Sequence, residues 1–460
     1  MFRPMKVVNP LARGWLLVLC LALSGTKCSD DVSISTEVDD AQKISDTAGN
    51  LDVDLDDGDR FGSAIAAIGD LEGDGVLDLG VGAPGDDDGG DNRGAVWILF
   101  MDDDGRVDLR RKISEDNVAF PDRLDNNDRF GSAVAAVGDL NLDGVFDIAV
   151  GAPGDDDGGD NRGAVWILFL DPEGTVQDLQ KISARVGGDL LGRLDDNDRF
   201  GSAVTSLGDL NGDGIPELAV GAPDDSDGGT GKGAVWILFM NNDGSVQSVQ
   251  KISDEEGDLE VDLDTNDHFG SALAGIGDLD GDGTNDLAVG ASGDDDGGFD
   301  RGAVWILFLN NDGTVNDAQK TSQNDGEFDG TLGDGDGFGS ALANIGDLDQ
   351  DGIADLAAGA PLSDDGGTDR GAVWILFPGE TGELRSELKI SDTEGNFDTN
   401  LSDGDRFGAA VAGIGDLNDD GRVDIGVGAP GDDDGGTDRG AVWILFLERV
   451  EIESDFELFP

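Results

Sequence analysis

The segment FGSALAGIGDLDGDGTNDLAVGAS, residues 269–292, places a short acidic stretch between two apolar runs of small residues. Within DLDGDGTND, residues 278–286, Asp occupies positions 1, 3, 5 and 9, and Gly283 occupies position 6. The runs on either side are typical of β-strands bounded by turn residues. The segment therefore predicts two strands joined by a loop that gathers like charges around one point.

The same segment recurs six times along the chain. The Phe of each Phe-Gly pair lies at position 61, 130, 200, 269, 338 or 407, so the copies are 69 or 70 residues apart. Two other markers also occur six times, the Trp of GAVWILF and the Lys of K-[IT]-S: Trp97, Trp166, Trp236, Trp305, Trp374 and Trp443; Lys43, Lys112, Lys181, Lys251, Lys320 and Lys389. Three markers with one period indicate six copies of one unit.

Each unit contains four predicted strands, and the second unit illustrates them. Its strands are predicted at 131–140, 147–153, 163–170 and 176–183, with turn-forming sequences between them. The third strand reads GAVWILFL without alternation, which is typical of a strand buried on both faces. Four-stranded units with both faces covered, repeated around an axis, predict an all-β fold, a β-propeller of six blades.

The two ends of the chain predict how the ring closes. The chain begins with the fourth strand of a unit, QKIS at 42–45, and stops soon after the third strand of the sixth unit, at 443–446. The N-terminal strand is therefore expected to complete the last blade, which removes the open edges. A solenoid is the alternative, but it would need atypical units at its ends.

The composition is strongly acidic, yet it is compatible with a folded core. The 460 residues include 100 acidic and 29 basic ones, the formal net charge is -71, and 38% of residues are hydrophobic. The recurring apolar blocks distinguish the chain from disordered acidic sequences. The charge argues against nucleic acid or an anionic membrane surface as partner, because both would repel it. It fits cation binding and a protein that stays soluble outside the cell.

The N-terminus predicts export. Three basic residues among the first thirteen precede the short apolar run GWLLVLCLAL, and small residues follow. We interpret this stretch as a secretory signal peptide and expect a protein that is secreted or on the cell surface. Only Cys28 would remain after cleavage, so no intrachain disulfide is expected. The predicted parts are a signal peptide at 1–24, an N-terminal lead-in at 25–42, the propeller at 43–447 and a C-terminal tail at 448–460.

The acidic loop has the donor pattern of a site for a hard cation. Carboxylates at positions 1, 3 and 5 of a tight loop can point to one centre, position 7 adds a carbonyl, and position 9 adds another carboxylate. Oxygen ligands in a flexible ring suit Ca²⁺ better than Mg²⁺. Position 12 is Val289, where an EF-hand carries Glu, so the loop is not an EF-hand.

All six units keep this set of oxygen donors, and position 6 is Gly in each. We expect about one Ca²⁺ per repeat. The alternative is a solvated acidic turn, since Asp and Gly are common turn residues, but six copies at fixed spacing and the repulsion of packed like charges favour the metal. The candidate metal ligands are Asp70, Glu72, Asp74, Asp78, Asp139, Asn141, Asp143, Asp147, Asp209, Asn211, Asp213, Glu217, Asp278, Asp280, Asp282, Asp286, Asp347, Asp349, Asp351, Asp355, Asp416, Asn418, Asp420 and Asp424.

These units resemble the FG-GAP repeats of the integrin α-subunit β-propeller. In the first unit FG lies at 61–62 and GAP at 82–84, with the acidic loop between them, and the resemblance covers about 43–447. It implies that the loops bind Ca²⁺ between the first and second strands of each blade. Unit four departs from the pattern with Ser292 in place of Pro, and unit five has GDGFG at 335–339 where the others have DRFG or DHFG.

The number of blades also departs from the integrin pattern. Integrin propellers have seven blades, whereas six units are counted here. A degenerate seventh would have to come from 25–42 and 447–460, and neither stretch contains FG or GAP.

A second acidic loop, GDDDGGDN at 85–92 and its counterparts, varies in spacing. We interpret it as a solvated loop, with a further cation or ligand site as the alternative. The six Trp are expected to fill the space between blades; a sugar-binding ring is the alternative. One basic residue follows each second loop and is expected to form local ion pairs of little energetic weight: Arg93, Arg162, Lys232, Arg301, Arg370 and Arg439.

Little in the sequence supports catalysis. His268 is the only His and takes a position held by Arg in four sister units, and there is no Tyr and no G-x-S-x-G motif. The resemblance implies an adhesion or macromolecule-binding module with a protein or glycan ligand, and we expect no enzymatic activity. We also expect a monomer, no nucleic acid partner and no insertion into membranes. Two alternatives stay open, an extracellular polysaccharide-acting enzyme or its accessory domain, and a structural component of a surface or matrix.

Overall fold

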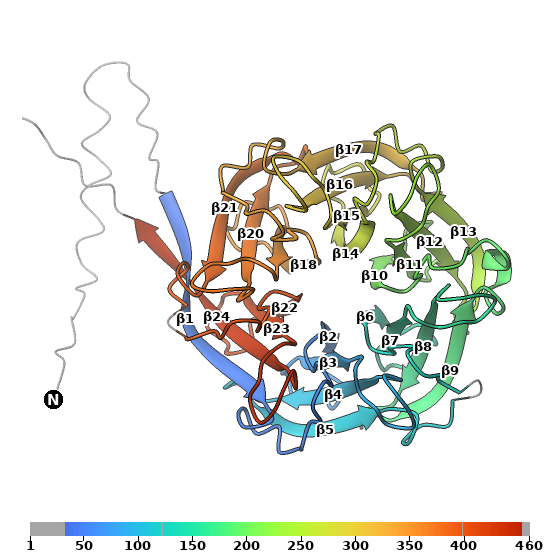
Figure 1. Cartoon of the computed structure of the whole chain (residues 1–460), viewed down its shortest axis with the longest axis horizontal. Helices are drawn as coiled ribbons and strands as arrows, with labels where there is room; N and C mark the ends of the chain where they lie inside the picture. The colour runs from blue at the N-terminus through green and yellow to red at the C-terminus, as the bar shows by residue number, and fades with distance from the viewer. Residues whose placement is uncertain (1–32, 121–122, 398, 453–460) are drawn as a thin grey trace, which may run out of the picture. The chain divides into compact units, whose positions relative to one another are not determined.

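Six four-stranded sheets form a β-propeller around a central axis in the unit Thr36–Val450 (Figure 1). The computed structural model describes residues 33–452 except 121–122 and 398. A second unit comprises Met1–Ser35 and Glu451–Pro460, and the predicted signal peptide at 1–24 and both Cys lie outside the described residues. The predicted all-β propeller of six blades is confirmed, and the described residues contain neither a seventh sheet nor a solenoid.

The strands of each blade follow one another outwards from the axis, and consecutive strands are antiparallel. Blade one contains β2 (Ala64–Gly69), β3 (Asp78–Ala83), β4 (Ala95–Met101) and β5 (Val107–Ile113). Blade two contains β6 (Ala133–Gly138), β7 (Asp147–Ala152), β8 (Ala164–Leu170) and β9 (Val176–Ser183). Blade three contains β10 (Ala203–Gly208), β11 (Glu217–Ala222), β12 (Ala234–Met240) and β13 (Val246–Ile252).

The second half of the ring repeats this order. Blade four contains β14 (Phe269–Gly277), β15 (Asp286–Ala291), β16 (Ala303–Leu309) and β17 (Val315–Thr321). Blade five contains β18 (Ala341–Gly346), β19 (Asp355–Ala360), β20 (Ala372–Pro378) and β21 (Leu384–Ser391). Blade six contains β22 (Ala410–Gly415), β23 (Asp424–Ala429), β24 (Ala441–Ile452) and β1 (Ser33–Ser45). The only helix of the described residues is a 3₁₀ turn, η1 (Gly188–Leu190), and no described helix is long and apolar enough to cross a membrane.

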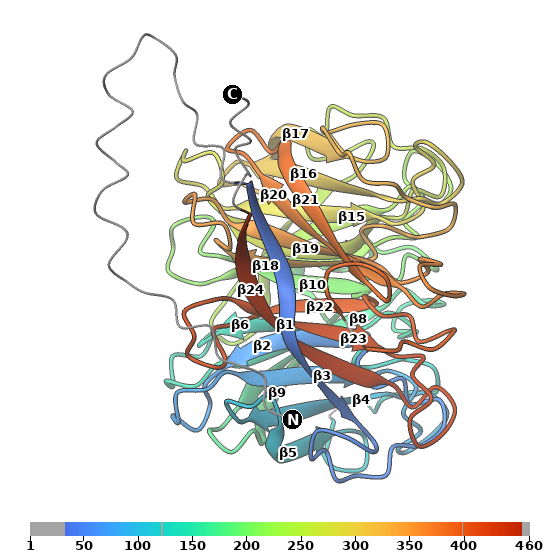
Figure 2. The same ribbon diagram turned by 90° about the vertical axis from the view of Figure 1, so that its left-hand side faces the viewer.

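The N-terminal strand closes the ring, as the sequence predicted. β1 pairs with β24 as the outermost strand of blade six, so the two ends of the chain share one sheet (Figure 2). Side chains reinforce the pairing. Lys43 Nζ lies 2.5 Å from Asp432 Oδ2, and Ser45 Oγ donates to Asp434 Oδ2 at 3.0 Å. Blade six therefore depends on residues nearly four hundred positions apart in the sequence.

The core lies between blades. The described residues form six hydrophobic clusters, each shared by two neighbouring blades and each containing one of the six Trp. All seven residues of β4 and its counterparts β8, β12, β16 and β20 are buried, so the third strands are covered on both faces. The predicted role of the Trp as filling between blades agrees with this packing.

The Phe-Gly pair forms the seam between blades. Phe130, at the start of blade two, makes a parallel bridge to Gly94 of blade one, and its N–H donates to the Arg93 carbonyl at 2.9 Å. Gly131 follows with φ +90°, and a Cβ there would come within 2.3 Å of the Ala95 carbonyl oxygen. A side chain would thus push the blades apart. The same bridge joins Phe61 to Gly440, Phe200 to Gly163, Phe269 to Gly233, Phe338 to Gly302 and Phe407 to Gly371.

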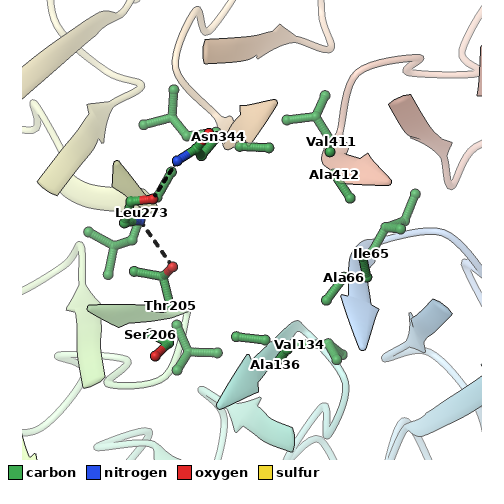
Figure 3. Close-up of a pocket in the computed structure, with 18 residues that line it drawn as sticks. Ile65, Ala66, Val134, Ala136, Thr205, Ser206, Leu273, Asn344, Val411 and Ala412 are labelled. Carbon is green, nitrogen blue, oxygen red and sulfur yellow. Dashed lines mark hydrogen bonds between the residues drawn. The ribbon is translucent and has the colours of Figure 1, made fainter. Parts of the chain in front are cut away.

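The innermost strands leave an axial channel of about 250 Å³ (Figure 3). Its lining is mostly Ala, Val, Ile and Leu, with polar side chains at Thr205, Ser206 and Asn344. Two of these bind the neighbouring blade: the Gly275 N–H donates to Thr205 Oγ1, and Asn344 Nδ2 donates to the Gly275 carbonyl, both at 3.2 Å. Two of the three polar side chains of the channel thus join adjacent blades.

Removing the closing strand should open the ring. A variant without residues 25–46 loses the fourth strand of blade six and exposes the edge of β24. We expect a lower melting temperature and a tendency to aggregate, measured by thermal scanning and light scattering. Deletion of 25–32 alone, which spares β1, is the control. A 25–46 deletion that stays monomeric and melts like the control would contradict closure by β1.

Candidate metal centres

Each acidic loop joins the first and second strands of its blade and folds around its own first carboxylate. In blade one, Asp70 accepts the N–H groups of Gly73, Asp74 and Gly75 at 2.7, 3.0 and 2.8 Å. Gly75, at position 6, has φ +99°, a left-handed conformation that favours glycine. The loop is therefore shaped by hydrogen bonds of its own, and position 6 is Gly because the turn requires it.

The carboxylate at position 9 is buried and ties the loop to the third strand. Asp78 is fully buried; its Oδ2 accepts the N–H of Leu71, at position 2, at 2.9 Å, and its Oδ1 accepts the N–H of Met101 at 3.3 Å. The corresponding acids in blades two, four and six make the same pair of bonds: Asp147 with Leu140 and Leu170, Asp286 with Leu279 and Leu309, and Asp424 with Leu417 and Leu447.

Blades three and five vary this arrangement. In blade three the longer Glu217 accepts the Leu210 N–H at 2.8 Å and Asn211 Nδ2 at 3.0 Å. In blade five, Asp355 Oδ2 accepts the Leu348 N–H at 2.7 Å, but its buried Oδ1 has no hydrogen-bond partner. Position 9 thus carries a buried acid in every blade, and one of the twelve carboxylate oxygens lacks a partner.

Three carboxylates among the candidate ligands come together in three of the six loops. Among the described residues, three carboxylates offer oxygens within 4.8 Å of one another in blades one, four and five. In blades two, three and six, position 3 is Asn; Asn141 and Asn211 donate to the position-5 Asp at 3.0 and 3.2 Å. The three carboxylate groups are Asp70, Glu72 and Asp78; Asp278, Asp280 and Asp282; and Asp347, Asp349 and Asp351.

The chemistry of these loops fits a hard divalent cation. All their side-chain donors except the Asn nitrogens are oxygens, the donor type that Ca²⁺ prefers. A carboxylate oxygen that accepts one N–H keeps a further lone pair for a metal. Burial raises the pKa of Asp355 to about 7 and that of Asp424 to about 6, because a charged carboxylate is poorly solvated there. A bound cation would supply the positive charge that these acids lack.

The sequence predicted a solvated second acidic loop, but this prediction is wrong for part of the loop, because one Asp in it is buried against a lysine. In blade two, Lys181 is 6% exposed, and its Nζ lies 2.7 Å from Asp155 Oδ2 and 2.8 Å from Asp157 Oδ2. The ammonium also lies 5.2 Å from the ring centre of Trp166, a cation–π distance. Lys43, Lys112, Lys251 and Lys320 make equivalent clusters with two Asp each, and Lys389 pairs with Asp365.

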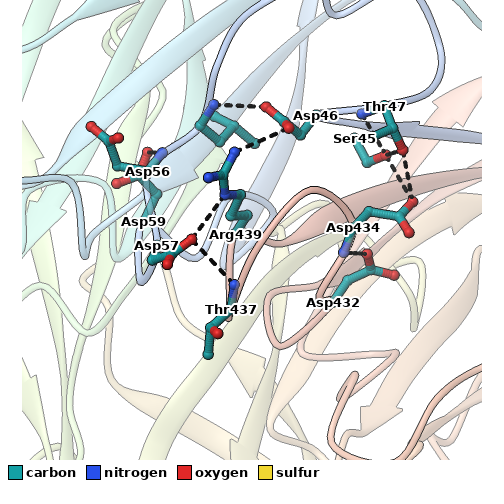
Figure 4. A network of polar contacts seen from close by, with 11 residues as sticks. Ser45, Asp46, Thr47, Asp56, Asp57, Asp59, Asp432, Asp434, Thr437 and Arg439 are labelled. Atoms are coloured by element: carbon teal, nitrogen blue, oxygen red, sulfur yellow. Dashed lines mark hydrogen bonds and ion pairs between the residues drawn. The ribbon is translucent and has the colours of Figure 1, made fainter.

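The basic residues after the second loop form the local ion pairs expected of them. Arg439 contacts Asp46 at 3.1 Å and Asp57 at 3.0 Å, which joins the end of the chain to its beginning (Figure 4). Asp57 is 63% exposed, so this pair contributes little to stability. Arg162, Lys232, Arg301 and Arg370 also pair with acids of the segment leading to the next blade.

A further buried acid lies beside each Lys–Asp cluster. Asp128 is 3% exposed and its Oδ2 accepts the Asp125 N–H at 2.8 Å. Loss of solvation, with a smaller effect of nearby Asp155, raises the pKa of Asp128 to about 7. Sequence reasoning missed these acids and the lysines. The available signal was a charged residue at the same position of every repeat, Asp two residues before the Phe of the Phe-Gly pair and Lys near the end of the fourth strand. Counterparts of Asp128 are Asp59, Asp198, Asp267, Asp336 and Asp405.

Comparison with known proteins agrees with this geometry. A profile described as the FG-GAP repeat matches residues 130–168, 200–238, 269–307 and 338–376. The chain carries FG-GAP repeats. Each match begins at the seam Phe and ends within the third strand, so it contains the whole acidic loop.

Curated relatives include integrin α-subunits. The chain is 33% identical to integrin alpha-5 of Xenopus laevis over 52% of this chain and 20% of that protein. It is 33% identical to human integrin alpha-11 over 43% of this chain and 15% of that protein. Phosphatidylinositol-glycan-specific phospholipase D of Bos taurus is 32% identical over 43% of this chain and 22% of the enzyme. The chain thus spans about a fifth of the length of these relatives. Its FG-GAP repeats and its similarity to integrin α-subunits agree with an integrin α-like β-propeller.

The buried acids beside the Lys–Asp clusters should make stability depend on pH. The pKa of Asp128 is raised on folding, so its contribution is fully present below its unfolded pKa near 3.8 and is lost as pH rises through about 7. In chelator, stability should therefore fall between pH 4 and 7. Asp128→Asn keeps an oxygen for the Asp125 N–H and should reduce the total loss of stability over this range, by at most about 4.5 kcal/mol at about 1.4 kcal/mol per pKa unit.

Denaturant unfolding at several pH values measures the slope. Asp103→Asn, which neutralises an exposed acid of a β-turn, is the control. Equal slopes for native protein, Asp128→Asn and control would show that Asp128 does not titrate in this range.

Proposed function

We propose that this protein is a secreted or cell-surface β-propeller that binds Ca²⁺ in its six acidic loops and acts as an adhesion or macromolecule-binding module. The observation that carries the proposal is the repeated loop: a backbone shaped by its first carboxylate, oxygen donors at positions 1, 3 and 5, and a buried acid at position 9. Each repeat would hold about one Ca²⁺ through the candidate ligands.

A rigid ring with polar loops at both ends suits the binding of a macromolecule. The six blades share buried contacts around the whole ring, so the loops are held on a fixed frame. The similarity to integrin α-subunits supports a protein or glycan ligand. The high negative charge disfavours nucleic acid as that ligand.

The second candidate function is that of an extracellular enzyme or its accessory domain, since one relative is a phosphatidylinositol-glycan-specific phospholipase D. His268 is the only His of the chain, and His is the residue that most often acts as a general base. Its contacts argue against a catalytic role. Its Nδ1 lies 3.0 Å from Asp224 Oδ1, and Arg199 of the preceding blade pairs with the same Asp at 3.0 Å. The His therefore takes part in an ion-pair seam between blades three and four.

Chelation should lower the melting temperature substantially. Binding to the folded state alone stabilises by about 2.7 kcal/mol per site when the cation is in hundredfold excess over Kd. Ca²⁺ should restore the melting temperature better than Mg²⁺, which demands stricter octahedral geometry. Asp280→Ala with Asp282→Ala should remove about one ion per chain, counted by inductively coupled plasma mass spectrometry. These acids are exposed, so the fold should survive their loss.

Asp103→Ala with Asp104→Ala is the matched control, because it removes two exposed acids from a turn outside the loops. It should keep the full ion count. Native protein without bound metal, melting identically in Ca²⁺ and in chelator, would mean that the loops are only turns.

The binding role is tested by a screen of glycans and matrix proteins with and without Ca²⁺, followed by turnover assays on any ligand found. Saturable binding without turnover is expected. Turnover of a polysaccharide or of a phosphatidylinositol glycan would favour the enzymatic alternative. Neither binding nor turnover would leave a structural surface or matrix component as the better description.

A further inference from the structure

Blade five differs from the other blades at the last residue of its third strand, which lies outside the cation loop. The third strand ends in Pro378, whereas the corresponding residues are Met or Leu in the other blades. In blades one, two, four and six the N–H of that residue donates to the buried carboxylate at position 9. Proline has no N–H, and the corresponding oxygen, Asp355 Oδ1, has no hydrogen-bond partner.

The missing bond leaves a buried charge without compensation. Asp355 is fully buried, and only its Oδ2 is satisfied, by the N–H groups of Leu348 at 2.7 Å and Asp349 at 3.3 Å. A buried acceptor without a donor destabilises the folded state by its full desolvation free energy, which is larger for a charged group. Blade five therefore carries this cost, which the position-9 acids of the other blades avoid.

The same carboxylate is connected to the cation loop. Its Oδ2 accepts backbone N–H groups from loop positions 2 and 3, next to the oxygens of Asp347, Asp349 and Asp351 that lie within 4.8 Å of one another. Arg385 of β21 pairs with Asp351, but its side chain is 48% exposed, and exposed pairs contribute little. The charge on Asp355 itself is left for a bound cation to offset.

We propose that blade five is the blade whose folding depends most on the bound divalent cation, and that Pro378 sets this dependence by removing the N–H that its sister blades supply. The inference rests on the proposed function, since it assumes that the loops bind a cation such as Ca²⁺. It assigns a role to a residue that is not itself a candidate ligand. Without the cation, the fifth loop holds one more unsatisfied charged oxygen than the loops beside it.

A pair of matched substitutions tests the proposal in chelator. Asp286 in blade four accepts two backbone N–H groups, so in Asp286→Asn the amide group must face one of them and lose a hydrogen bond. In Asp355→Asn the amide group can take the place of the unpartnered Oδ1, and a buried charge disappears. We expect Asp286→Asn to melt several degrees below the native protein, and Asp355→Asn to melt at or above it. An equal loss in both variants would overturn the proposal.

Pro378→Leu provides the complementary test and restores the N–H that Leu170, Leu309 and Leu447 supply in other blades. It should raise the melting temperature in chelator and reduce the gain that Ca²⁺ produces. An unchanged gain, with a native ion count, would refute the role of Pro378 and leave calcium binding standing. If the native protein binds no Ca²⁺ at all, the proposed function itself fails. Ion counts and melting curves of all four proteins, each in Ca²⁺ and in chelator, separate these outcomes.

Discussion

The burial of each third strand on both faces is the constraint from which the rest of the structure follows. A strand such as β8 has no solvent-facing side, so it needs a neighbouring blade on each face. Six such units cover both faces of every third strand only in a closed ring, and β1 from the N-terminal part of the chain completes the sheet of the last unit. Close approach of the blades then excludes side chains at the seam: a Cβ on Gly82 would lie 1.9 Å from the carbonyl oxygen of Gly131.

The two acidic loops of a blade handle their charge in different ways. They lie at opposite ends of the second strand, because the first loop precedes that strand and the second loop follows it. At one end, Lys181 compensates Asp155 and Asp157 from within the same blade. At the other end, the described contacts of Asp147 are backbone N–H groups, which offset part of one negative charge and no more. The first loop therefore keeps negative charge that a bound cation would offset.

Sequence reasoning succeeded where the signal was periodic and failed where it depended on register. The repeat spacing located the strands of blade two to within a few residues. The closing strand was located because the sequence starts with the fourth strand of a repeat and its last repeat has only three strands. The Lys–Asp clusters were missed because they depend on Trp166 pairing with Lys181 across two strands, which brings the ammonium to the second loop. The effect of Pro378 was hidden for a similar reason: nothing in the sequence shows which backbone N–H faces a buried carboxylate.

The acidic loops also take part in the seams between blades, through the residue at position 8. In blade two this residue is Phe146, whose ring occupies the space where a side chain on Gly69 of blade one would lie. In blade four it is Asn285, whose Nδ2 donates to the Leu207 carbonyl of blade three at 2.6 Å. Position 8 stands between the candidate ligands at positions 7 and 9, so an ion that fixes those two residues also fixes the contact with the preceding blade. The stabilising effect of a cation would therefore extend beyond one loop to the joint between two blades, and so to the ring that buries the third strands.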